Sequence, residues 1–498
     1  MKLNKKVLTF FSISYIYIPI ILFLLGWIKI YFALVVIAAI MYCFRKIVFL
    51  SSYSKDDEIY IDKSVIVFAT LFFAWLGYYA GWGRFVDQAS DWMKHNAVLY
   101  DLVNKGWPVI YENDGELSML TYYIAQYIVP AFCGKIFSSI RLAEVVMYLW
   151  NVVGLILVFL NIVVFVKANN YLEQFIVTIV LPFFSIPLWL AEVILKRVSL
   201  FNQIGSERWF YSVDGIMMQY SSNFVLLRWV TPQTIPIWLI VIMLLLNKDK
   251  MCYFAFYLIP SILFGTLTFI GIIPLAIGII LENIIASKEI RKCCHDIFSI
   301  ENIVIILSEG FIFIGYFWGN VMSDKESALG FERMPYTANT YILYFVFVGI
   351  AIMPYAIALW DGYKRDGAYL FGILSLVVLP LFKMGMYNDL MMRSSIPALF
   401  VLMVYILSYL NDSIKHNRNR KIQVMVIVCL MLIGLYYPFG EVSESVRTED
   451  YAALGNSFEW NSLEVLANRN LDEDLDLKYN YYSYDLDKNV FYQYMMPH

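Results

Sequence analysis

Two aspartates and a histidine recur at four-residue intervals in the first long polar segment of the chain, at Asp87, Asp91 and His95. On a helix this spacing places the three side chains on one face. A carboxylate beside an imidazole can take the proton of an attacking hydroxyl, which is general-base chemistry. The same spacing is typical of an amphipathic helix whose polar face meets water, so the pattern alone leaves both interpretations open.

Two further motifs stand at the mouths of apolar runs. The motif from Asn388 to Arg393 precedes the run from Ser394, and an arginine there can hold a phosphate through two parallel hydrogen bonds. The alternative is an interfacial arginine that reaches toward lipid headgroups. The segment Trp229 to Gln233 (W-V-T-P-Q) opens another run. Its proline would loosen the first helical turn and leave Gln233 polar at a depth where polar groups are costly.

Other familiar constellations are absent from the sequence. There is no Ser-His-Asp spacing, phosphate-binding loop or dinucleotide motif, and Glu309 is the acid most deeply placed within an apolar run. The six cysteines include no C-x-x-C pair, which argues against a zinc site or a disulfide framework. The net charge of −3 argues against a nucleic-acid partner, because no basic domain is present.

The composition places these residues in a membrane protein. Of the 498 residues, 60% are hydrophobic and only 15% are charged, whereas soluble domains run near one-quarter charged. Since a span needs about 20 apolar residues, we expect an all-α fold with about thirteen transmembrane helices. Eleven predicted spans and a hairpin of two short helices lie at about 7–25, 28–44, 64–82, 143–166, 172–195, 224–246, 251–281 (the hairpin), 300–320, 339–359, 367–384, 394–410 and 422–438.

The apolar run 117–137 decides the topology, because it either spans the membrane or lies on its surface. If this run is not a transmembrane span, most Lys and Arg residues of the short loops lie on the same side of the membrane as Lys2, Lys5 and Lys6. This is what the positive-inside tendency requires. We therefore expect a cell-membrane protein with its N-terminus cytoplasmic and its C-terminus extracytoplasmic. The domains would be a transmembrane domain (1–438) with an outer loop at about 83–141, and an extracytoplasmic tail (439–498).

Three polar segments then share the outer face: the loop 83–141, the segment 196–223 and the tail. From Gly440 onward the tail holds twelve Asp and Glu but four Lys and Arg, and tyrosines such as Tyr481 give it some capacity to pack. A protein that gathers its polar mass on one face is expected to work there.

This organisation resembles the GT-C superfamily of membrane glycosyltransferases, which use polyprenyl-phosphate-linked sugars. The resemblance is carried by the segment Gln88 to Asn96 with Trp107-Pro108, by W-x-x-P-Q at 229–233, by N-D-x-x-M-R-x-x-I-P from Asn388 to Pro397, and by the stretch from Leu120 to Ala143. The motifs are similar to those of a bacterial branch found among cell-envelope polysaccharide genes. The resemblance implies a large first outer loop with two interfacial helices.

Residue by residue, the resemblance implies Asp91 as the general base, with Asp87 as the runner-up and His95 and Asn96 orienting the base or the acceptor. Arg393 would stabilise the departing polyprenyl phosphate, with Asp389 fixing it or binding sugar hydroxyls. Gln233 would line the pocket. The predicted partners are a polyprenyl-phosphate-sugar donor, a glycan or lipid acceptor and the lipid bilayer.

Two features depart from the superfamily pattern. Two spans, not one, precede the helix that leads into the acidic loop. The usual adjacent pair of aspartates is replaced by Asp87 and Asp91 four residues apart, so no metal site or cofactor is predicted, although a divalent metal remains possible. Two other functions stay open: a transporter or flippase of lipid-linked saccharides, and a polysaccharide polymerase or ligase of another fold.

Overall fold

The computed structural model describes residues 2–50, 58–86, 88–89, 91–113, 116–194, 210–211, 216–287, 289–323, 331–384, 388–416, 420–452, 460–467 and 481–497. Over these ranges the chain is helical apart from short strands, which confirms the predicted helical class. The expected GT-C-like arrangement and the count of thirteen spans stay predictions.

The helices of the first half are α1 (Lys5–Trp27), α2 (Ile30–Arg45), α3 (Lys63–Tyr79), α4 (Trp92–Asn104), α5 (Ala125–Ile136), α6 (Ile140–Val166), α7 (Tyr171–Phe183), α8 (Leu188–Ile194), α9 (Asn223–Trp229) and α10 (Thr231–Leu246). Those of the second half are α11 (Phe254–Leu258), α12 (Ser261–Phe264), α13 (Thr266–Ser287), α14 (Ile290–Ile297), α15 (Ile300–Ile305), α16 (Phe311–Ser323), α17 (Tyr341–Ala351), α18 (Met353–Tyr363), α19 (Gly367–Val378), α20 (Asp389–Ser394), α21 (Ile396–Lys415), α22 (Lys421–Gly434), α23 (Tyr436–Ala452) and α24 (Leu463–Ala467).

Within the described ranges, seven helical stretches are long and apolar enough to cross a membrane, or up to nine if each of two bent pairs is one span. The bent pairs are α7 with α8 and α17 with α18, at 51° and 46°. The stretches are Lys5–Trp27, Ile30–Leu50, Ile140–Val166, Thr266–Ser287, Ile290–Gly319, Asp389–Lys415 and Lys421–Arg447. Other predicted spans coincide with shorter apolar helices: Lys63–Tyr79, Thr231–Leu246, Met251–Phe264 and Gly367–Leu381.

Helix α6 shows how local sequence sets these lengths. Ser139 caps its first turn by accepting a hydrogen bond from the Leu142 amide (3.2 Å), and Lys167 ends it in a left-handed conformation with φ of 57°. The 27 residues between them rise about 40 Å, more than the hydrocarbon thickness of about 30 Å.

Two predicted segments differ in detail. Residues 251–281 form two short pieces, α11 and α12, followed at Gly265 by α13, whose 22 residues reach Ser287. The second arm of the expected hairpin is therefore a full-length helix, because its apolar run continues past residue 281. The run 117–137 divides into strand β4 and the 12-residue α5, which would span only about 18 Å. A helix of this length alone would not cross the hydrocarbon core, and its interfacial placement stays a prediction.

Short strands close the two ends of the bundle. The strands are β1 (Lys2–Asn4) paired with β2 (Glu58–Tyr60), β3 (Ile110–Asn113) with β4 (Glu116–Leu120) and β9 (Tyr482–Ser483), β5 (Phe210–Tyr211) with β6 (Met217–Met218), and β7 (Phe331–Arg333) with β8 (Phe382–Met384). All of these pairs are antiparallel.

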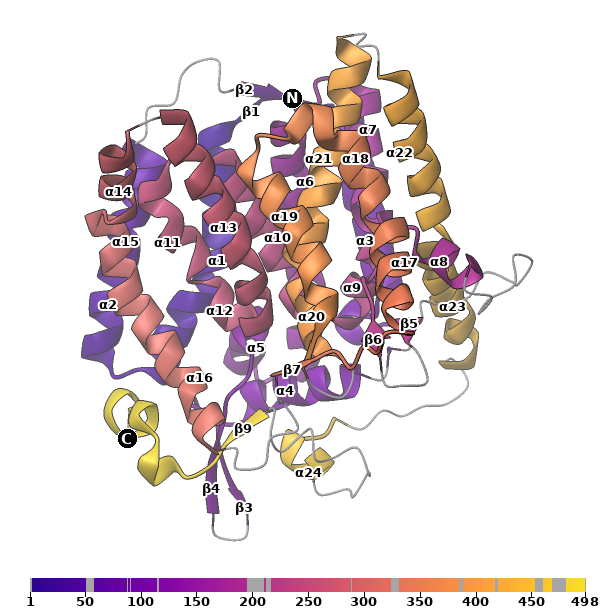
Figure 1. Ribbon diagram of the computed structural model, residues 1–498. Coiled ribbons are helices and arrows are strands. Elements are labelled where there is room, and N and C mark those ends of the chain that lie inside the picture. The colour runs from indigo at the N-terminus through magenta and orange to yellow at the C-terminus, as the bar shows by residue number, and fades with distance from the viewer. Residues whose placement is uncertain are drawn as a thin grey trace.

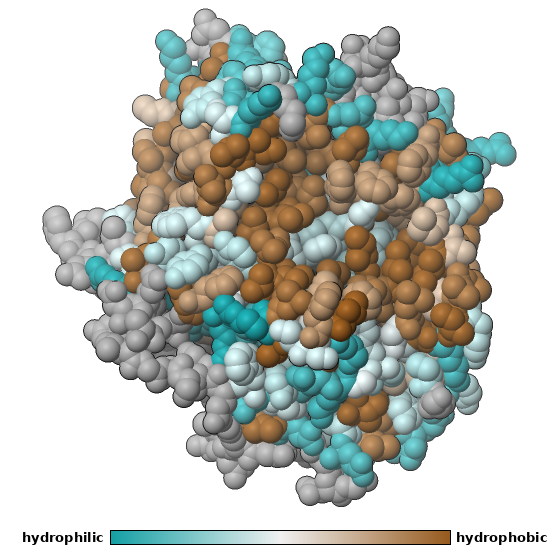
Figure 2. Space-filling model, turned by 180° about the vertical axis from the view of Figure 1, so that it is seen from behind, coloured by the Kyte–Doolittle hydropathy of each residue, from teal (hydrophilic) through white to brown (hydrophobic). Residues whose placement is uncertain are grey.

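The two ends of the bundle differ in bulk (Figure 1). The N-terminus and the β1–β2 pair lie at one end, while α4, α24, the β3–β4–β9 sheet and the C-terminus lie at the other. Figure 2 shows apolar side chains across the middle of the rear face, with hydrophilic ones toward both ends. Such an exposed apolar belt fits a lipid bilayer. The predicted boundary at residue 439 falls inside α23.

Candidate functional site

Helix α4 packs against the end of the bundle at the junction of α9 and α10. The indole Nε1 of Trp92 donates to the carbonyl oxygen of Arg228 (2.7 Å), and that of Trp82 donates to the carbonyl oxygen of Leu227 (2.9 Å) and to Thr231 (3.0 Å). The turn from Leu227 to Thr231, which overlaps the W-V-T-P-Q motif, thus holds both Trp82 and the start of α4. A freely solvated amphipathic helix would not be held in this way.

His95 is buried, although the sequence pattern also allowed the face of α4 that carries it to contact water. Its Nδ1 lies 2.5 Å from the hydroxyl of Tyr127, and its ring also hydrogen-bonds to the Trp229 backbone. Burial lowers the pKa of His95 to about 4; the positive charge of Arg393 also lowers the pKa, whereas the negative charge of Asp91 raises it. The histidine is therefore neutral at pH 7 and suited to orienting its neighbours.

Asp91 stands immediately before α4 and remains open to solvent. Its side chain is 43% exposed, and its nearest cation is Lys94 at 3.8 Å. It acts electrostatically on His95, Tyr122 and Tyr127, and Arg393 acts on the same three groups. Asp91 and Arg393 therefore lie within electrostatic reach of His95; their roles stay predictions. Asp87 lies outside the described residues.

Arg393 is held by its own helix turn. Asn388, with φ of 52°, accepts a hydrogen bond from the Met391 amide and starts α20, and Asp389 Oδ1 then accepts one from Arg393 Nε (3.0 Å). The Arg393 side chain is only 18% exposed, and its Nη groups have no hydrogen bond to any described residue. With respect to the described residues, the N–H groups of both Nη atoms can therefore donate to an anion.

Three tyrosines that the sequence did not single out as site residues complete the cluster. Tyr122 and Tyr481 stack with ring centres 4.2 Å apart, and the Thr121 amide donates to the Tyr481 carbonyl (2.9 Å). Burial raises the pKa of both tyrosines, and Arg393 opposes this shift. With Tyr127 they form an aromatic wall around His95 and Arg393. Aromatic faces of this kind can pack against sugar rings or prenyl chains.

The remaining predicted residues take supporting positions. Asn96 donates to Gln88 (2.6 Å), which donates in turn to the carbonyl oxygen of Gly81 (2.6 Å). Gly81 has a left-handed φ of 86°, so Asn96 braces a tight loop ahead of α4. Gln233 is buried beside Gly265 at the α12–α13 break, and its Oε1 has no hydrogen-bond partner among the described residues.

The C-terminal tail covers the outer loop. Asp101, fully buried in α4, accepts hydrogen bonds from the Tyr111 hydroxyl (2.9 Å) and the Leu463 amide (3.0 Å). Burial raises the pKa of this carboxyl. Farther along, Trp460 donates to Glu144 (2.9 Å). The tail is thus part of the layer that contains the site.

Glu309 lies apart from the site. It is fully buried in the π-helical turn between α15 and α16, with its Oε2 3.5 Å from the Tyr17 hydroxyl. Across the residues that the structure describes, no three His, Cys, Asp or Glu side chains gather as a metal site.

Comparison with known proteins adds no relative: no family model, curated protein or solved structure matches this chain.

Proposed function

We propose that the chain is a membrane glycosyltransferase that moves a sugar from a polyprenyl-phosphate donor to a cell-envelope glycan or lipid acceptor. One arrangement supports the proposal: a partly exposed carboxylate, Asp91, and the guanidinium of Arg393, whose Nη groups bond to no described residue, both lie within electrostatic reach of the buried His95–Tyr127 pair at the polar end of the bundle. Glycosyl transfer from a phosphate donor requires a general base and a group that stabilises the departing phosphate in the same site.

In the proposed reaction Asp91 and Arg393 each have one role. Asp91 takes the proton of the acceptor hydroxyl as its oxygen forms a bond to the anomeric carbon, while the bond from that carbon to the phosphate oxygen breaks. The electron pair leaves with the polyprenyl phosphate, whose growing negative charge Arg393 stabilises through its Nη donors. A single displacement of this kind inverts the anomeric configuration.

The residues around this pair would set its geometry. Asp389 holds the Arg393 side chain through Nε, which turns the Nη groups toward the ligand. Neutral His95, fixed by Tyr127, gives the base a defined neighbour without adding positive charge. Asn96 and Gln233 would act from the edge of the site. The bulkier polar end would face the cell exterior, with the N-terminus in the cytoplasm.

The test is transfer by purified protein in liposomes, with a panel of radiolabelled polyprenyl-phosphate hexoses and extracted envelope glycans as acceptors. Formation of a new glycosidic bond with release of polyprenyl phosphate supports the proposal, provided Asp91→Asn abolishes it. Glu112→Gln, an exposed acid of β3 in the same layer, is the matched control and should retain activity. Movement of the lipid-linked sugar across the liposome membrane without a new bond would instead support a flippase.

A further inference from the structure

A cavity of about 350 Å³ opens between α7, α21 and α22, away from the proposed active site. Its wall is apolar except for three residues, Glu173, Ser185 and Asn411. The other lining residues are Val166, Ile176, Val177, Ile179, Val180, Phe183, Phe184, Leu407, Leu410, Ile414, Val424, Val428, Met431, Leu432 and Leu435. Its volume equals that of about a dozen water-sized groups of about 30 Å³ each, which suits part of a hydrocarbon chain.

Helix α22 bounds the cavity on the lipid side. Near its C-terminal end it approaches α7 so closely that a Cβ on Gly434 would lie 2.3 Å from the Ser185 carbonyl oxygen. Little of the most apolar part of the stretch Lys421–Arg447 is buried, and Met425 and Leu432 are more than 60% exposed. A hydrocarbon chain can therefore reach the cavity from the bilayer beside α22.

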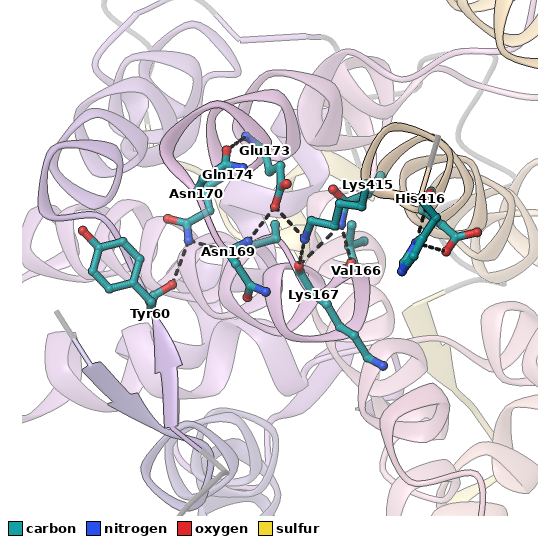
Figure 3. A network of polar contacts seen from close by, with 12 residues as sticks. Tyr60, Val166, Lys167, Asn169, Asn170, Glu173, Gln174, Lys415 and His416 are labelled. Atoms are coloured by element: carbon teal, nitrogen blue, oxygen red, sulfur yellow. Dashed lines mark hydrogen bonds and ion pairs between the residues drawn. The ribbon is translucent and has the colours of Figure 1, made fainter. Parts of the chain in front are cut away.

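Glu173 and Asn411 lie at one end of the cavity and Ser185 at the other, and Figure 3 shows the polar network around Glu173. Lys415 Nζ lies 2.9 Å from Glu173 Oε2 and donates to the Lys167 carbonyl oxygen (2.6 Å), while Glu173 also accepts from the Asn169 amide (2.6 Å). The neighbouring Gln174 bonds to the Tyr60 carbonyl oxygen, and Tyr60 pairs with Lys2 in the β1–β2 ribbon. The charged end of the cavity thus lies at the N-terminal face, opposite the site.

Asn411 supplies a second observation that points to a ligand. It lines the cavity, is 9% exposed, and donates through Nδ2 to the Val166 carbonyl oxygen (2.8 Å). Its Oδ1 is buried without a hydrogen-bond partner among the described residues. An unmade hydrogen bond of this kind is costly, so a ligand donor at this point would be favoured.

We propose that this cavity holds one acyl chain of a zwitterionic aminophospholipid, with the headgroup at the Lys415–Glu173 pair. The pair presents one positive and one negative charge, which matches a phosphate and an ammonium in a single headgroup. An anionic headgroup whose phosphate engages Lys415 offers no cation to Glu173 in exchange. The ammonium N–H groups also supply the donor that Asn411 Oδ1 lacks.

The experiment is native mass spectrometry of the full chain in mild detergent, after incubation with equal amounts of palmitoyl-oleoyl phosphatidylethanolamine and phosphatidylglycerol. We expect retention of the ethanolamine lipid over the glycerol lipid. Val428→Trp, which narrows the cavity from the side of α22, should lower this retention at least fivefold, whereas Ile422→Trp, at an exposed position of the same helix that does not line the cavity, should not. Equal retention of both lipids, or an unchanged Val428→Trp, would overturn the proposal.

A charge exchange tests the headgroup site without altering the cavity volume. Lys415→Glu and Glu173→Lys should each remove the preference for the ethanolamine lipid, and the double variant should restore it. A preference that survives both single variants would exclude this pair as the headgroup site. This readout stands independently if Val428→Trp fails to fold.

Discussion

The Nδ1 of His95 and the hydroxyl of Tyr127 lie 2.5 Å apart in a buried contact between α4 and α5. The contact joins α4 to α5, and burial keeps the imidazole neutral by lowering its pKa to about 4. Because the ring is already engaged by the Tyr127 hydroxyl and the Trp229 backbone, His95 is not free to take the proton of an acceptor hydroxyl. The polar stripe of α4 therefore divides into a reacting residue and a positioning residue.

This contact predicts a pH dependence of stability. In the unfolded chain the imidazole has a pKa of about 6.5, so between pH 6.5 and 4 the unfolded state binds a proton that the folded state does not. The contribution of His95 is fully present above pH 6.5 and is lost as the pH falls to 4, by about 3 kcal/mol in total. Thermal unfolding of wild type and His95→Gln across this range measures it. Equal slopes for the two proteins would refute the assignment.

Asp91→Asn should lower transfer by about 100-fold to 10,000-fold, the range typical of a lost general base. The side chain is 43% exposed and its one ion pair is long, so the melting temperature should be unchanged. Initial rates and thermal unfolding of the same preparations separate the two effects. If Asp91→Asn keeps wild-type rates, another group must act as the general base, and Asp87→Asn is the next variant to measure.

Arg393→Ala should lower the turnover number by about 100-fold to 1,000-fold, as for the loss of one transition-state donor. Arg393→Lys should recover part of the rate, because it restores the charge without the fork of two donors. Arg333→Ala, an exposed arginine of β7, is the control and should behave as wild type. Equal losses at both arginines would indicate a general effect of surface charge.

The ion pair between Arg228 and Glu441 predicts a strong effect on stability. Its atoms lie 2.8 Å apart, with the side chains 8% and 4% exposed. Removing one partner, as in Arg228→Met or Glu441→Leu, leaves an uncompensated buried charge and should cost about 3–5 kcal/mol. The double variant should cost less than either single change. Thermal unfolding in detergent measures all three, and additive losses would contradict this coupling.

Much of the helical framework could be predicted from the sequence, because apolar runs of sufficient length carry their own signal. The runs at 7–25, 28–44 and 143–166 coincide with α1, α2 and α6. The predicted hairpin at 251–281 ends before the helix does, because the sequence gives Pro260 and Pro274 the same helix-breaking signal. Only Pro260 ends up between helices, whereas α13 continues through Pro274.

The site was less accessible to sequence reasoning. Asp91 and Arg393 are far apart along the chain, and only a resemblance placed them together. The burial of His95 could not be foreseen, because its partner Tyr127 belongs to a helix that hydropathy alone could not assign. The sequence indicates that Tyr481 can pack but not against what: its stacking on Tyr122 accompanies a strand of two residues, which leaves no periodic pattern.

The pairing of β9 with β4 also has a consequence for biosynthesis. A ribosome makes β4 early, whereas β9, the strand that lies beside Met119 and Leu120, follows all of the long apolar helices. The amide of Lys29, between the first two helices, likewise donates to the carbonyl oxygen of Met495 (2.7 Å). The layer around the site can therefore close only after residue 495 has been made and docked, so a ribosome that stalls before β9 leaves the site open.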